Sequence, residues 1–178
     1  MENNAVFQSI DEILSKVNLN DVTSESNGRE NIPDGYYMCE VEKAEITVSK
    51  SSGTPQVAFR FTILEDGTDV VVEADGSIAK NSIARTKNRK IFMYYPLKDE
   101  RSVKRFVSDM LKFEGDTAGE PLLSKEYFTT SEVLEDALDI LCGMRIYVQV
   151  STSTNKEGQE MSWQNLVSWK RVDQLELN

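Results

Sequence analysis

The stretch QVAFRFTIL, from Gln56 to Leu64, decides how the rest of the chain is interpreted. Its bulky apolar residues occupy every second position, at Val57, Phe59, Phe61 and Ile63. Because successive side chains of a β-strand point to opposite faces, this alternation predicts a strand with one buried and one exposed face. Arg60 is expected on the exposed face.

A strand is predicted on each side of this stretch. Upstream, IPDGYYMCEVEKAEITV opens with turn residues and then alternates over Tyr37, Cys39 and Val41. Downstream, RKIFMYY is a strand that Pro96 stops. Lys90, Phe92 and Tyr94 alternate along this strand and share one face. Because that face begins with a lysine, we expect it to point outward. The other face is expected inside: Ile91, Met93 and Tyr95.

The segment between the strand QVAFRFTIL and the strand RKIFMYY is polar and basic. DVVVEADGSIAKNSIARTKN begins with a short β-prone run, and the remainder is predicted to be a loop. Residues 83–88 of that loop are interpreted as a flexible, basic approach segment.

Helical periodicity follows the third strand. Residues 99–111 and 131–141 each place their apolar residues on one face, and Ser131 is expected to cap the second helix. Two further strands are predicted in GMRIYVQVST and SWQNLVSWKRV. In the first of them, Ile146 is expected inside, and Arg145 and Tyr147 outside.

The order of three strands, one or two helices and two strands predicts the fold. It is the plan of a mainly β domain with some α, a five-stranded Greek-key barrel of the OB type. We assign residues 32–178 to this domain, as a single-stranded nucleic-acid-binding module. Residues 1–31 are predicted to be a short N-terminal amphipathic helix, with an apolar stripe from Phe7 to Val17, followed by a polar linker.

The composition excludes several classes of protein. No apolar run approaches the roughly 20 residues of a membrane span, and the N-terminus lacks a signal-peptide pattern. A cytoplasmic protein is therefore expected. Cys39 and Cys142 lie in apolar surroundings, so both are predicted to be small buried hydrophobes rather than disulfide partners or metal ligands.

The chain of 178 residues has no histidine, which limits its chemistry. Ser–His and Cys–His nucleophiles are excluded, and the commonest transition-metal ligand is missing. The acidic residues are scattered like those of solvated surfaces. We therefore predict no catalytic residues, no metal and no cofactor. A metal-dependent nuclease remains a rival interpretation because Asp and Glu are plentiful.

Charge is distributed unevenly along the chain. The net charge is −10, yet the segment from Lys80 to Arg105 holds nine basic and two acidic residues. That segment therefore carries +7 and the rest of the chain −17. A local field of one sign is what a polyanion would meet, and the acidic remainder would repel nonspecific contact.

Cations and outward aromatics coincide in this segment, which favours contact with single-stranded nucleic acid. Phe92, Tyr94 and Tyr147 are the stacking candidates, and Trp163 is a further one that could equally be core. The cationic candidates lie on the strands, in the basic loop and in two hairpin loops: Lys50, Arg60, Arg85, Lys87, Arg89, Lys90, Arg145 and Lys156.

Two plainer interpretations compete with this one. Strand aromatics are more often core residues than ligand platforms, and loop cations are usually only solvated. Alternatively, the basic segment would meet an acidic protein partner, with the N-terminal helix docked in a groove.

The layout also resembles a known family. VNLNDV, IPDGYYMCEVEKAE, FRFTIL, RKIFMYYPL, LCGMRIYVQVSTSTNKEGQ and NLVSWKRV follow one another as in the single-stranded DNA-binding proteins of tailed bacteriophages. The shared patterns are Pro-x-Gly-Tyr, from Pro33 to Tyr36, and Leu-x-Gly-x-x-x-x-Val, from Leu141 to Val148. The resemblance covers the chain from Asn18 onward.

This resemblance implies an OB-fold, no catalytic residues and sequence-independent cover of single-stranded DNA during replication or recombination in an infected bacterial cell. Replication or recombination proteins are then possible partners. The C-terminal DQLELN is only mildly acidic, which leaves the N-terminal helix as the element for partner binding or self-association.

Overall fold

The computed structural model of this chain describes residues 31–178, and residues 32–178 form one compact unit. The predicted N-terminal helix and nearly all of the predicted linker lie outside the described residues.

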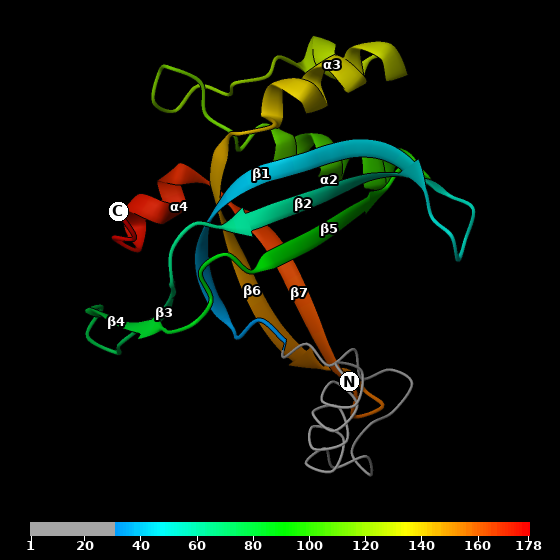
Figure 1. The fold of residues 1–178 in the computed structure, drawn as a ribbon. Coiled ribbons are helices and arrows are strands. Elements are labelled where there is room, and N and C mark those ends of the chain that lie inside the picture. The colour runs from blue at the N-terminus through cyan, green and yellow to red at the C-terminus, as the bar shows by residue number, and fades with distance from the viewer. Residues whose placement is uncertain (1–30) are drawn as a thin grey trace, which may run out of the picture. The chain divides into compact units, whose positions relative to one another are not determined.

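The seven strands of the described residues pair antiparallel in one sheet (Figure 1). The strands are β1 (Gly35–Val48), β2 (Pro55–Ile63), β3 (Gly67–Val72), β4 (Ile78–Ile83), β5 (Lys90–Pro96), β6 (Arg145–Thr154) and β7 (Glu160–Val167). Their order is β4-β3-β1-β2-β5, and β6 pairs with β1 and with β7. The long β1 is central because its first half pairs with β6 and its second half with β2.

The prediction of a closed five-stranded OB-type barrel is wrong. The sheet is open, since β5 and β7 do not pair with each other within the described residues. Alternation within a strand tells which side chains share a face, but it does not tell whether the two end strands meet. β4 was also not predicted from its sequence IAKNSI, because this strand is an exposed arm of a hairpin and lacks an apolar face.

Two helices were predicted at the right place. α2 (Glu100–Met110) is capped by Asp99, whose Oδ1 accepts a hydrogen bond from the Ser102 N–H at 2.8 Å. α3 (Ser131–Leu141) is capped by Thr130 rather than by the predicted Ser131.

The structure adds a 3₁₀ turn, η2 (Lys125–Phe128), and a terminal helix, α4 (Trp169–Gln174). The last predicted strand therefore runs too far, because β7 ends at Val167. No helix of the described part is long and apolar enough to cross a membrane.

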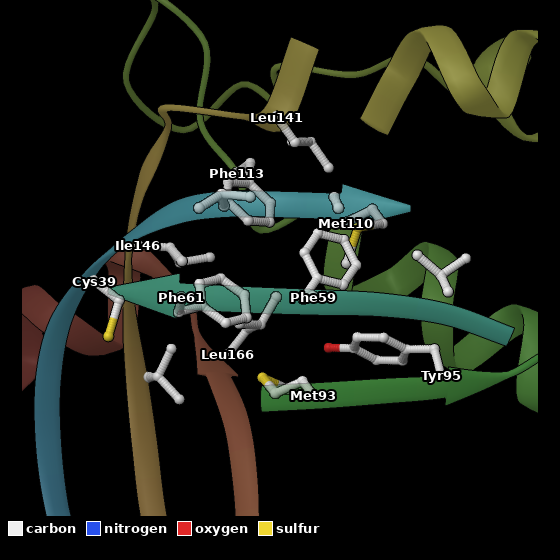
Figure 2. Packing of buried hydrophobic residues seen from close by; sticks show 14 of the residues in the cluster. Cys39, Phe59, Phe61, Met93, Tyr95, Met110, Phe113, Leu141, Ile146 and Leu166 are labelled. Carbon is white, nitrogen blue, oxygen red and sulfur yellow. The ribbon is translucent and has the colours of Figure 1, made fainter. Parts of the chain in front are cut away.

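The core lies on one face of β1, β2, β5 and β6, where α2 and α3 also contribute side chains (Figure 2). Phe59, Phe61 and Ile146 are buried there, as predicted. Cys39 is buried as predicted, but Cys142 is exposed, because it directly follows the last residue of α3.

The opposite face of the sheet is divided into two parts. Over β1, β6 and β7, α4 and the residues after it pack onto Tyr147, whose hydroxyl donates to the Leu177 carbonyl at 2.9 Å. No helix of residues 31–178 covers the part formed by β2, β5 and the second half of β1 in this way, and that part holds the candidate site.

Candidate nucleic-acid interface

Two aromatic side chains stand exposed on β5. Phe92 is 43 % exposed and Tyr94 is 58 % exposed, whereas their neighbours Ile91, Met93 and Tyr95 are buried. β5 pairs with β2 so that Phe92 lies opposite Arg60 and Tyr94 opposite Ala58. The small Ala58 leaves open space beside the Tyr94 ring, and Arg60 sets a cation beside Phe92.

A depression of about 660 Å³ lies over these residues. Its walls come from the second half of β1, the turn between β1 and β2, and the outward residues of β2 and β5. Lys43 and Lys50 line it together with Arg60, Phe92 and Tyr94. The depression is therefore lined by aromatic rings, cations, small or polar neutral side chains and one acid, Glu45, which pairs with Lys43 at 2.7 Å.

Glu42 lies between the two central cations. Its Oε1 is 3.1 Å from an Arg60 terminal nitrogen, and its Oε2 is 2.6 Å from Lys90 Nζ. Lys90 also donates to the Thr62 hydroxyl at 2.7 Å. The hydrogen bond from Lys90 is the largest cause of the lowered pKa of Glu42, so this carboxylate is charged at neutral pH.

Sequence reasoning missed Glu42, because it precedes Lys90 by 48 positions and lies on another strand. It occupies the irregular position of β1, between Val41 and Lys43, where the register against β2 shifts. The buried Nε of Arg60 has no hydrogen-bond partner in the described part of the chain.

Arg85 and Lys87 lie in the loop between β4 and β5, and both are exposed. This loop, predicted to be flexible, has backbone hydrogen bonds that anchor it. Asp66 Oδ1 accepts the N–H groups of Thr86 and Lys87, each at 3.0 Å, and these bonds lower the pKa of Asp66. The buried Thr86 hydroxyl accepts the Gly67 N–H at 2.8 Å and donates to the Ile83 carbonyl at 2.9 Å. The two cations therefore project from an anchored backbone at the Lys90 end of β5.

Two predicted residues face away from the depression. Arg89 directly precedes β5, in register with its buried residues, and its charge acts on Tyr37, whose pKa burial raises to about 12. Tyr147 does face outward as predicted, but α4 covers it, and only 5 % of it is exposed. The sequence feature that indicated this covering helix was the apolar pair Trp169 and Val172, three positions apart.

Two other predicted cations lie elsewhere. Arg145 lines a separate depression beside Met38 and Trp169. Lys156 lies in the turn of the β6–β7 hairpin, which Figure 1 shows at a different end of the sheet from the β1–β2 turn. These two residues are not part of the surface over β2 and β5.

A second depression, of about 540 Å³, adjoins the first at Tyr94. It lies between the end of β5, the start of α2 and β7, and Trp163 lines it with 45 % of its surface exposed. Sequence reasoning did not assign the three cations that line it, Lys98, Arg101 and Arg105. The available signal was the spacing of four positions between Arg101 and Arg105, which places these two on one side of a helix, with Lys98 just before its cap.

No group of three or more Cys, Asp or Glu side chains in residues 31–178 is arranged to hold a metal ion.

The chain matches a known family over just over half of its length. Residues 16–108 match the family described as "Protein of unknown function (DUF669)". The match spans just over half of the chain and includes β1 to β5, with Phe92 and Tyr94. A comparison with curated proteins gives no match.

Proposed function

We propose that this chain, which belongs to the DUF669 family, is a non-enzymatic protein that binds single-stranded DNA without regard to sequence. The observation that carries the proposal is the exposed pair Phe92 and Tyr94, two positions apart on β5 and flanked by Arg60 and Lys90. The bound strand would lie over β2, β5 and the second half of β1.

The spacing of the two rings suits an unstacked strand. Residues two apart on a β-strand are separated by about 6.8 Å, twice the rise of about 3.4 Å per residue. Stacked bases in a duplex also rise by about 3.4 Å, so two neighbouring bases can each meet a ring only when the strand is extended. Every base has a ring face, which makes such stacking tolerant of sequence.

The charges around the rings favour a polyanion. Lys43, Lys50 and Arg60 line the depression, and Lys87 and Lys90 lie at one end of β5. The acidic remainder of the chain would keep other polyanions away from the rest of the surface. Binding driven in this way releases counterions and should weaken steeply with salt.

The biological role in this proposal is the cover of single strands during phage DNA replication or recombination. What supports that role is the resemblance to bacteriophage single-stranded DNA-binding proteins, in the order of segments from VNLNDV to NLVSWKRV.

A titration of tyrosine and tryptophan fluorescence with oligo-dT at two salt concentrations tests the proposal. Stacking on Tyr94 should quench the emission, and the affinity should fall as salt rises. Polyglutamate carries negative charge without rings, so it should bind weakly and leave the emission unchanged. Lack of binding to oligo-dT at low salt, or equal affinity for polyglutamate, would contradict the proposal.

Glu42→Gln is expected to tighten the binding of oligo-dT at low salt. The substitution keeps the shape of the side chain but releases Arg60 and Lys90 from a charged partner. Two additional phosphate contacts would steepen the dependence of log K on log salt by up to about 1.4. The measurement is a salt series on the variant and the wild type.

The matched control is Glu135→Gln, which makes the same change in net charge on the exposed side of α3. It should leave affinity and salt dependence almost unchanged. An equal gain in both variants would attribute the effect to net charge alone, and a weaker Glu42→Gln would show that Glu42 positions the two cations for binding.

A further inference from the structure

The second depression adjoins the first, because Tyr94 lines both. It runs from Tyr94 past the end of β5 to the first turns of α2 and to Trp163 on β7. The Trp163 ring is held in position, since its Nε1 donates to the Ser153 hydroxyl at 2.7 Å. An exposed aromatic side chain is therefore fixed at the far side of the depression.

The cations of α2 run against the helix dipole, whereas Asp99 and Glu100 at its N-terminus suit it. Arg101, Lys104 and Arg105 lie in the first half of the helix, and the last turn has no basic residue. Cations stabilise a helix near its C-terminus and destabilise it near its N-terminus. Helix stability therefore does not explain this arrangement, and departures of this kind are expected where a surface has a function.

Lys98, Arg101 and Arg105 form no salt bridge with any described residue. The acid that lines the same depression is Asp99, and its carboxylate is occupied as the cap of α2. The pKa of Asp99 is lowered chiefly by the Ser102 N–H, and also by the nearby Lys98 and Arg101. The depression thus has three cations and one carboxylate that is already bonded.

We propose that this depression is a second subsite for the same nucleic-acid strand. The strand would leave the surface over β2 and β5 at Tyr94 and continue along α2. Arg101 and Arg105 would contact its phosphates, and one base would stack on Trp163. This inference rests on the proposed function, because it extends the path of that strand.

The test compares two lengths of oligo-dT that bracket the site sizes of single-strand binding grooves, about 4 and about 16 nucleotides. The long strand should bind more weakly to the double variant Arg101→Gln/Arg105→Gln than to the wild type. The slope of log K against log salt should fall by about 1.4, because two phosphate contacts are lost. The short strand should bind as it does to the wild type. Lys104→Gln is the matched control, because Lys104 is on the same helix but pairs with Glu100 and does not line the depression.

Trp163 supplies a second readout. The long strand should quench more tryptophan emission than the short one, and Trp163→Phe should abolish this difference. Unchanged affinity of the long strand in the double arginine variant, or equal losses for both lengths, would overturn the second subsite. If the wild type bound neither strand, the proposed function itself would fail.

Discussion

Replacing Phe92 and Tyr94 together by alanine is expected to weaken the binding of oligo-dT by at least about 30-fold. Each base stacked on an aromatic side chain contributes roughly 1–3 kcal/mol, so the loss of two rings costs about 2 kcal/mol or more. Both side chains are largely exposed, so the melting temperature should change little. Fluorescence anisotropy of a labelled oligo-dT measures the affinity, and circular dichroism measures the melting temperature.

The matched control is Val71→Ala/Val72→Ala on β3. These residues are 43 % and 56 % exposed, close to the values for Phe92 and Tyr94, and β1 and β2 separate their strand from β5. The control should bind like the wild type. Tyr94→Phe, which keeps the ring, should retain most of the affinity. A double alanine variant that binds normally would remove Phe92 and Tyr94 from the site.

The faces of the individual strands could be predicted from the sequence. Alternation placed Phe59 and Phe61 in the core and Phe92 and Tyr94 outside, because burial of one face leaves a period of two in the sequence. The arrangement of the strands could not be predicted in this way. Whether β5 and β7 pair depends on the twist of the sheet and on the side chains between its ends, and alternation records neither.

The candidate site was predictable where it depends on local sequence and not where it depends on contacts between distant segments. Phe92 and Lys90 share a face because they are two positions apart. Glu42 reaches Lys90 only through the pairing of β1 with β2 and of β2 with β5. Tyr147 was assigned to the correct face, but a helix more than twenty positions later covers it.

Asp109→Ala is expected to have the largest effect on stability, because Asp109 joins three elements. Its Oδ2 accepts the Tyr95 hydroxyl at 3.0 Å, and its Oδ1 accepts Lys112 Nζ at 2.6 Å. Lys112 Nζ also donates to the Leu166 carbonyl at 2.8 Å. The network therefore runs from β5 through α2 and Lys112, two residues after the helix, to β7, across the opening between the two end strands.

Removal of this carboxylate leaves the buried Tyr95 hydroxyl and the mostly buried Lys112 ammonium without their shared partner. Breaking a buried ion pair in this way costs about 3–5 kcal/mol. For a chain of this size, such a loss lowers the melting temperature by about 10 °C. Thermal unfolding followed by circular dichroism measures it. Tyr95→Phe, which keeps the pair of Asp109 and Lys112, should cost only about 1 kcal/mol.

Tyr95→Phe also provides a test of how stability depends on pH. Burial, and then the charge of Asp109, raise the pKa of Tyr95 above its usual range. A raised pKa contributes stability that is complete below the unfolded value of about 10 and decreases as the pH rises above it. Tyr95→Phe should therefore lose less stability than the wild type on alkaline titration.

Equal melting temperatures for Asp109→Ala and the wild type would show that packing alone holds β5, α2 and β7 together. The walls of the second depression would then not depend on this network.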